Sequence, residues 1–288
     1  MNEEIIGLYD EHTNGNVSRR NFVDNLARLV GSSAAALALL PVLEGDESQT
    51  QAPIVAEDDK TLAISRIEYD ASGTKIAGYL ARVKAGGKRP AVIVIHENRG
   101  LNPHIQDVAR RIAVEGFLAL APDMLSPLGG TPSDETQATK MIGSLKTEET
   151  VARLAAAVRF LATHAESTGK VGVVGFCWGG GMVNELAAAG ASLNAAVSYY
   201  GRQIPAAQVP KISAPLLLHY AGLDERINAG IPDFEAALKA NGKMYEKYMY
   251  EGANHAFNNN TNPARYNKEA ADLAWSRTIK FLKKYLAT

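Results

Sequence analysis

Residues 171–181 read VGVVGFCWGGG, and this stretch decides the fold. A buried strand rich in β-branched residues runs into Cys177, glycines stand on both sides of it, and a helix follows at once. The pattern is a G-x-S-x-G nucleophile elbow with cysteine in the serine position. Glycine suits the flanking positions because so sharp a strand-to-helix turn leaves no room for side chains there. The turn places Cys177 at a helix N-terminus, where the helix dipole favours a thiolate and backbone N–H groups can bind an oxyanion.

Around this stretch, short apolar runs alternate with longer segments of helical period. The predicted strands are residues 64–69, 76–82, 91–95, 117–121, 171–175, 195–199, 216–220 and 247–250. The predicted helices are residues 103–115, 147–164, 180–189, 231–241 and 266–286. This alternation is typical of parallel strands joined by right-handed crossovers. We therefore expect an α/β domain over residues 62–288, with a mostly parallel, doubly wound sheet and helices on both faces.

The first 61 residues differ from the rest and are expected to form an N-terminal arm and linker. Residues 18–22 read SRRNF and precede an apolar, alanine-rich run over residues 26–43, which resembles a twin-arginine (Tat) export signal. Asp24 and Arg28 interrupt this pattern, and the alternative is an amphipathic helix packed against the body or a partner. Export to the periplasm and a cytoplasmic location both remain open. The segment is too short and too interrupted to predict stable membrane insertion.

Composition excludes several function classes. The chain has 30 Lys and Arg against 31 Asp and Glu, and a net charge of −1 argues against a broad nucleic-acid surface. A single cysteine excludes a disulfide framework and any site that needs several thiolates. No histidine has a second ligand at metal spacing, so we predict neither a metal nor a cofactor. A lone cysteine is often buried core, so the catalytic argument depends on the surrounding elbow. Homo-oligomerisation stays open.

A nucleophile elbow needs an acid and then a histidine, each just after a strand. Asp224 and His255 follow the last two predicted strands in that order. Because open α/β sheets build sites at the carboxyl ends of their strands, we expect Asp224 to orient His255, and His255 to exchange a proton with Cys177. Glu225 is a competing acid. The structural alternatives are a loop-capping carboxylate and a surface histidine.

These residues resemble those of the dienelactone hydrolases (carboxymethylenebutenolidases), a family of the α/β-hydrolase superfamily. The likeness covers roughly residues 62–286. It rests on HENRG at 96–100, APD at 121–123, GFCWGG at 175–180, YYG at 199–201, Asp224, and GANHAF at 252–257. A cysteine elbow combined with a glutamate at the end of an early strand is specific to this family. The resemblance implies an α/β-hydrolase fold and a hydrolase.

The resemblance also implies a role for each site residue. Cys177 is the nucleophile of the Cys-His-Asp triad just described. Glu97 matches the family glutamate that contacts the thiol at rest and helps to ionise it when substrate binds. The backbone N–H groups of Asn98 and Trp178 match the oxyanion hole. Without the family, Glu97 would be interpreted as a strand-end carboxylate paired with Arg99.

The chain departs from the family pattern in its arginines. Dienelactone-cleaving members hold the substrate carboxylate with one arginine shortly after the Pro-Asp dipeptide and another shortly after the histidine, and residues 124–130 and 256–260 contain none. Arg99 or Arg202 would have to serve instead, and Tyr200 is a further candidate for substrate contact. We therefore expect hydrolysis of a small ester or lactone, with an undefined acyl group, through a cysteine acyl-enzyme. The alternatives are a non-catalytic binding protein of the same fold with a vestigial thiol and, less favoured, a thiol peroxidase or redox sensor.

Overall fold

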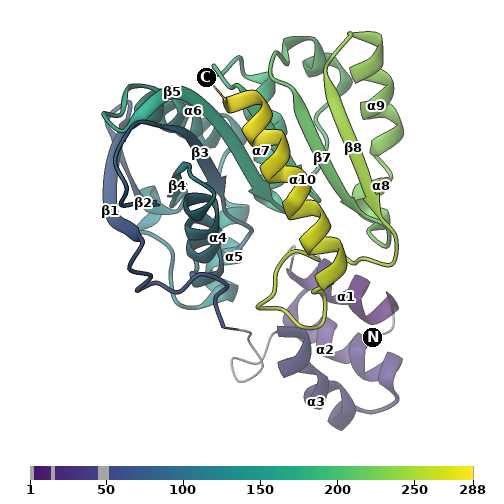
Figure 1. Cartoon of the computed structure of the whole chain (residues 1–288). Coiled ribbons are helices and arrows are strands. Elements are labelled where there is room, and N and C mark those ends of the chain that lie inside the picture. The colour runs from purple at the N-terminus through teal and green to yellow at the C-terminus, as the bar shows by residue number, and fades with distance from the viewer. Residues whose placement is uncertain (1–2, 14–16, 45–51, 288) are drawn as a thin grey trace.

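The elbow stretch ends a central strand of an eight-stranded sheet. The structure is a computed structural model and describes residues 3–13, 17–44 and 52–287. The sheet has the order β1-β2-β4-β3-β5-β6-β7-β8 (Figure 1). Its strands are β1 (Leu62–Ala71), β2 (Thr74–Val83), β3 (Arg89–Ile95), β4 (Leu118–Pro122), β5 (Ser167–Phe176), β6 (Ala195–Tyr199), β7 (Leu216–Ala221) and β8 (Tyr245–Tyr250). The strands from β4 to β8 pair in parallel, and β1 and β2 add an antiparallel edge.

Helices cover both faces of the sheet. One face packs against α6 (Thr147–Thr163), α7 (Trp178–Ala188) and α9 (Ile231–Ala240). The other face packs against α4 (Pro103–Val114) and α10 (Lys268–Leu286), which crosses the front in Figure 1. Strands β4, β6 and β7 are wholly buried, β3 is nearly so, and β5 is buried from Val171 to Phe176, because these strands have helices on both sides. The predicted α/β-hydrolase fold is confirmed.

The structure adds short elements that hydrophobic period does not reveal. Helix α5 (Glu135–Gly143) begins at Asp134, whose side chain accepts from two backbone N–H groups, and only two of its side chains are buried. Helix α8 (Glu225–Asn228) and the 3₁₀ turns η2 (Ser126–Leu128) and η3 (Ala206–Lys211) are shorter still. Each lies in a loop beyond a strand.

The N-terminal arm is a unit of three helices, not one. They are α1 (Glu3–Thr13), α2 (Arg19–Val30) and α3 (Ser33–Glu44), and the apolar run over residues 26–43 is broken where Gly31 takes a φ of 86°. The three helices share a core of their own around Phe22 and Leu26. In Figure 1 they lie beside the loop that follows β8. Residues 45–51 of the predicted linker lie outside the described residues.

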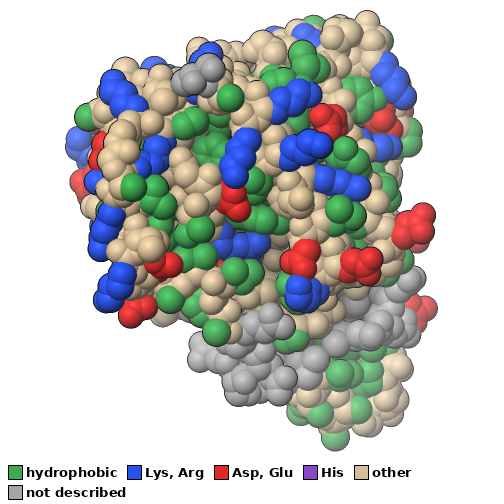
Figure 2. All heavy atoms as spheres, viewed as in Figure 1, with side chains coloured by type: hydrophobic (Ala, Val, Ile, Leu, Met, Phe, Trp, Pro, Cys, Tyr) green, Lys and Arg blue, Asp and Glu red, His purple; other side chains and the backbone are tan. Residues whose placement is uncertain are grey.

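Surface character agrees with the balanced composition. Basic and acidic side chains are interspersed on the face shown in Figure 2, and hydrophobic side chains gather at the outer end of the arm. Among the described residues, no single helix is long and apolar enough to cross a membrane. Helix α2 and residues 33–40 of α3 pass that test only as a pair, and they are bent by 114°. The predicted export signal stays a prediction.

Candidate active site

Cys177 is held in the strained conformation that an elbow requires. Its φ is 54° and its ψ is −116°, and it stands between β5 and α7 as the N-cap of the helix. Its N–H donates to the carbonyl of Tyr199 at 3.1 Å, and its own carbonyl accepts from Gly181 at 3.1 Å. A non-glycine residue in such a region costs about 1–3 kcal/mol, so the surrounding fold must hold it there. The predicted position of the cysteine at a helix N-terminus is confirmed.

Two glycines explain how closely the elbow packs. A Cβ on Gly175 would lie 2.3 Å from the carbonyl oxygen of Gly179. A Cβ on Gly179 would lie 2.4 Å from the oxygen of His96 and 2.6 Å from that of Ile95. These atoms that a new Cβ would meet are backbone atoms, which cannot rotate away as the end of a flexible side chain can. The absence of both side chains therefore brings Cys177 against the end of β3, where Glu97 follows.

Asp224 and His255 form the expected pair. Their loops follow β7 and β8, and Nδ1 of His255 lies 2.5 Å from Oδ2 of Asp224. The other carboxylate oxygen accepts from the N–H of Ile227 at 3.3 Å. Both side chains are buried, whereas Glu225 is exposed and opens helix α8. Asp224, rather than Glu225, therefore contacts His255, and its role as the acid of a triad stays a prediction.

The electrostatic surroundings favour a protonated His255 and an ionised Asp224. Burial alone would lower the pKa of His255, but the negative charges of Cys177 and Asp224 outweigh it and raise that pKa well above its ordinary value. Burial alone would raise the pKa of Asp224, but His255 outweighs it and holds that pKa below its ordinary value. Nε2 of His255 is buried and has no hydrogen-bond partner among the described residues. This nitrogen is therefore available to exchange a proton with a reacting group.

Glu97 is held on both of its oxygens. Oε1 accepts from the hydroxyl of Tyr200 at 3.4 Å, and Oε2 accepts from Nδ2 of Asn259 at 2.9 Å. Burial, followed by the charges of Glu97 and Cys177, raises the pKa of Tyr200 well above its ordinary value, so this tyrosine stays a donor. Within the described residues, Glu97 makes no hydrogen bond with Cys177. The contact with the thiol stays a prediction.

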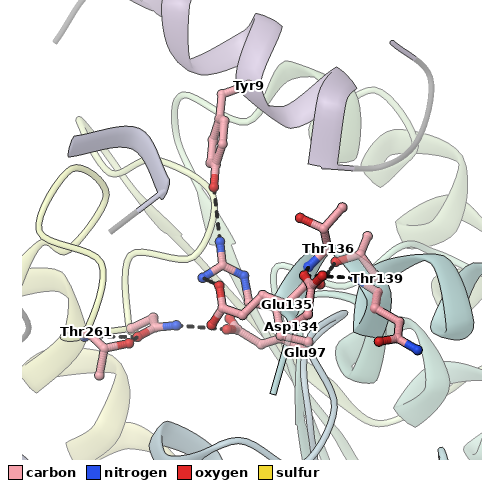
Figure 3. Close-up of polar contacts among 10 residues, drawn as sticks. Tyr9, Glu97, Asp134, Glu135, Thr136, Thr139 and Thr261 are labelled. Carbon is pink, nitrogen blue, oxygen red and sulfur yellow. Dashed lines mark hydrogen bonds and ion pairs between the residues drawn. The ribbon is translucent and has the colours of Figure 1, made fainter. Parts of the chain in front are cut away.

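The pairing of Glu97 with Arg99, expected without the family, is wrong. Arg99 forms an ion pair with Glu135 of α5 instead, at 2.7 Å. It also donates from Nη2 to the hydroxyl of Tyr9 in the arm, at 3.1 Å. Both partners are far away in the sequence. Figure 3 shows Tyr9 reaching down from the arm toward the carboxylates of Glu97 and Glu135.

The ring of His96 holds the backbone next to the predicted oxyanion hole of Asn98 and Trp178. Its Nδ1 donates to the carbonyl of Glu97 at 2.7 Å, and its Nε2 accepts from the N–H of Met124 at 3.2 Å. Its ring stacks on Trp178 with centroids 5.2 Å apart. Trp178 is the first residue of α7, where backbone N–H groups have no acceptor within the helix. These contacts give His96 a structural role beside the site.

Two hollows meet at Cys177 and His255, which line both of them. The narrow hollow, of about 430 Å³, is polar, and its walls include Tyr9, Glu97, Asn98, Arg99, Asn259 and Arg265. The wide hollow, of about 900 Å³, has apolar and charged residues in its walls, which include Ile142, Leu145, Trp178, Met182, Tyr200, Glu185, Arg202 and Arg226. The structure thus brings the sequence-predicted site residues together. It divides them between the two hollows, with Arg99 in one and Arg202 in the other.

The pairing of Asp224 with His255 beside an elbow cysteine is the geometry of a hydrolase. A family model described as the dienelactone hydrolase family matches residues 76–286. The chain belongs to the dienelactone hydrolase family. As a member, it is a hydrolase of the ester and lactone class. Within the described residues, no group of three or more His, Cys, Asp or Glu side chains is placed to hold a metal ion.

Individual proteins that are similar to this chain support its assignment to the dienelactone hydrolase family. A Saccharolobus solfataricus protein named "Putative carboxymethylenebutenolidase" is 33% identical over 255 residues, which cover 76% of this chain and 97% of that protein. A Bradyrhizobium protein named "Probable 2-oxo-3-(5-oxofuran-2-ylidene)propanoate lactonase" is 32% identical, and the match covers 79% and 96% of the two chains. The crystal structure of a "Putative Dienelactone Hydrolase" from Klebsiella pneumoniae has a TM-score of 0.71 at 28% identity, covering 78% of this chain and 99% of that one.

Sequence reasoning missed several residues of this dienelactone hydrolase site. Asn259 holds Glu97, while Asn262 and Arg265 line the narrow hollow from the same loop. The run of asparagines at 258–260 is the only sequence signal for them, because buried amides so close to His255 need partners. The sequence gives no such signal for Tyr9, because this residue belongs to a separate helical unit.

Proposed function

We propose that the chain hydrolyses a small ester or lactone through a cysteine acyl-enzyme built on Cys177, His255 and Asp224. The observation that carries the proposal is the 2.5 Å contact between His255 and Asp224 beside a cysteine on a strained elbow. That contact fixes the imidazole by Nδ1, and His255 lines both hollows together with Cys177. A nucleophile, a base and a group that orients the base are the three parts of such a triad.

In the acylation half, the Cys177 thiolate attacks the carbonyl carbon of the substrate. The negative charge that develops on the carbonyl oxygen is held by the backbone N–H groups of Trp178 and Asn98. The protonated His255 then gives its proton to the leaving oxygen as the C–O bond breaks, and a thioester remains on the cysteine. The raised pKa of His255 suits this step, because the imidazolium is the required acid.

In the deacylation half, His255 takes a proton from water, and the resulting hydroxide attacks the thioester. The C–S bond breaks, the carboxylic acid leaves, and the Cys177 thiolate and the protonated His255 are restored. Asp224 stabilises the imidazolium in both halves and keeps the ring in one orientation. Glu97 assists ionisation of the Cys177 thiol from its place in the narrow hollow. Two hydrogen bonds keep its carboxylate there.

The substrate proposed is a small ester or lactone. Relatives named for carboxymethylenebutenolide and for an oxofuranylidene lactone support the lactone class. The two hollows favour a molecule with a compact polar end on one side of the reacting carbonyl and a larger group on the other. The positive charges of Arg99 and Arg265 in the narrow hollow suit a polar group rich in oxygen.

The test is a panel of short-chain esters and lactones against the wild type and Cys177→Ala. Removing the nucleophile should lower kcat by about 10³-fold or more, with unchanged circular dichroism. Mass spectrometry of His255→Ala after brief exposure to an activated ester should show an acyl group retained on Cys177. Turnover by Cys177→Ala at the wild-type rate would refute the proposal. A thiol that no ester acylates would favour the non-catalytic alternative.

A further inference from the structure

A side chain from the N-terminal arm reaches the reacting centre. Tyr9 of α1 is 3% exposed and lines the narrow hollow together with Cys177 and His255. Its hydroxyl accepts from Nη2 of Arg99 at 3.1 Å, and the guanidinium carbon of Arg265 stands 5.0 Å from its ring centroid. Tyr9 thus contacts both arginines that line the narrow hollow, and Figure 3 shows it extending from the arm toward the site.

The arm fixes this ring from behind. Tyr9 packs in the core that α1, α2 and α3 share, with its ring centroid 5.8 Å from that of the fully buried Phe22. That core is separate from the two cores that flank the sheet. The three-helix unit is therefore a small folded body that presents one aromatic side chain to the active site. The ring cannot swing away without disturbing its own packing.

The contact also reaches the wide hollow. Arg99 lies between Tyr9 and Glu135, donating to the first and forming an ion pair with the second. Glu135 is the first residue of α5, and Ile142 near the end of that helix lines the wide hollow. A continuous line of contacts thus runs from the arm to a helix that shapes the second hollow.

We propose that Tyr9 is a specificity-determining wall of the active site, limiting the size and charge of the group accepted beside Arg99 and Arg265. The proposal rests on the proposed function of Cys177 as nucleophile. With Tyr9 in place, the phenol covers one arginine by a hydrogen bond and the other by its ring face. Only a short polar group then fits. The arm is part of the working enzyme, and a chain from which the arm had been removed would have a longer and more cationic pocket.

The first test measures access to Cys177 without turnover. Full-length wild type, Tyr9→Phe and Tyr9→Ala are alkylated with neutral iodoacetamide and with anionic iodoacetate, which both form an S–C bond and release iodide. Uncovering two guanidinium groups should raise the iodoacetate rate relative to the iodoacetamide rate by about 10-fold in Tyr9→Ala. Tyr9→Phe should give a smaller increase, because the ring still covers Arg265. An unchanged ratio in Tyr9→Ala would overturn the proposal.

A matched control separates the side chain from the stability of the arm. Leu8 adjoins Tyr9 on α1 and is half-buried against the arm's own core, but it does not line the hollow. Leu8→Ala should leave the alkylation ratio at the wild-type value. If Leu8→Ala changes the ratio as much as Tyr9→Ala does, general loosening of the arm is the cause, and the specific role of Tyr9 is refuted.

The second test measures specificity itself. Values of kcat/KM for p-nitrophenyl acetate and for the mono-p-nitrophenyl ester of succinic acid should diverge in Tyr9→Ala. The longer, anionic substrate should gain about 10-fold relative to acetate. Equal changes for both esters would overturn the proposal. If no variant hydrolyses either ester but the alkylation ratio shifts as expected, the proposed hydrolysis of small esters through Cys177 fails while the wall formed by Tyr9 stands.

Discussion

Replacing Gly179 by alanine probes the packing that brings the elbow against β3. The new Cβ would lie 2.4 Å and 2.6 Å from two carbonyl oxygens at the end of that strand. Overpacking of this kind costs about 1–3 kcal/mol, because a buried strand must shift to make room. The matched control is Gly181→Ala in the same helix, where the nearest atom would be 3.6 Å away. There alanine meets only ordinary contacts, and it should stabilise the helix by about 0.5–1 kcal/mol.

The two variants should therefore differ by about 1.5–4 kcal/mol in the free energy of unfolding, which follows from adding the cost in one to the gain in the other. For a chain of this size, that difference corresponds to at least about 3 °C in Tm. Thermal unfolding followed by circular dichroism measures it. Gly179→Ala should also lose ester hydrolysis, since a shift of about 1 Å at the elbow costs on the order of 10²-fold in rate. If Gly179→Ala unfolds at the same temperature as Gly181→Ala, the close approach of α7 to β3 does not require glycine at position 179.

Three further predictions concern the reacting groups. Asp224→Asn should lower kcat about 10⁴-fold because it loses the carboxylate that orients His255, whereas Glu225→Gln should keep near wild-type activity; comparable losses would refute the assignment of the acid. Because the pKa of His255 is raised in the folded chain, the stability from its protonated form is present below pH 6.5 and is lost as pH rises through the folded-state pKa. Wild type should thus lose more stability than Cys177→Ala between pH 7 and alkaline pH in urea titrations, and parallel curves would contradict this. Glu97→Gln should fold normally but lose about 10²-fold or more in kcat/KM on the ester panel, and full activity would exclude a proton-handling role.

Local pattern and chain order were enough to predict the centre of the site. A glycine-framed cysteine after a buried strand has few alternatives to an elbow, and the packing of Gly175 and Gly179 shows why. Asp224 and His255 could be placed because the carboxyl ends of parallel strands meet at one edge of a sheet. Such rules need no knowledge of distant contacts.

Distant contacts are what the sequence did not reveal. Arg99 pairs with Glu135 rather than with Glu97, because α5 brings a carboxylate to it from the loop after β4. That helix is mostly polar and exposed, so hydrophobic period could not predict it. Tyr9 could not be predicted as a site residue for a similar reason, because nothing in the sequence around it indicates a contact with the site. The twin-arginine pattern in the same region predicts export and gives no indication of a contact with the active site.

The meeting of two hollows at one sulfur atom has a consequence for the order of events in a catalytic cycle. The tetrahedral intermediate on Cys177 would have one part of the substrate on each side, and the thioester that follows would keep only the acyl part. The alcohol can then leave through one hollow while water enters through the other. In a lactone the alcohol stays tethered to the acyl group and can return to attack it. Separate exits would let that tethered hydroxyl move aside, which would favour hydrolysis over closing the ring again.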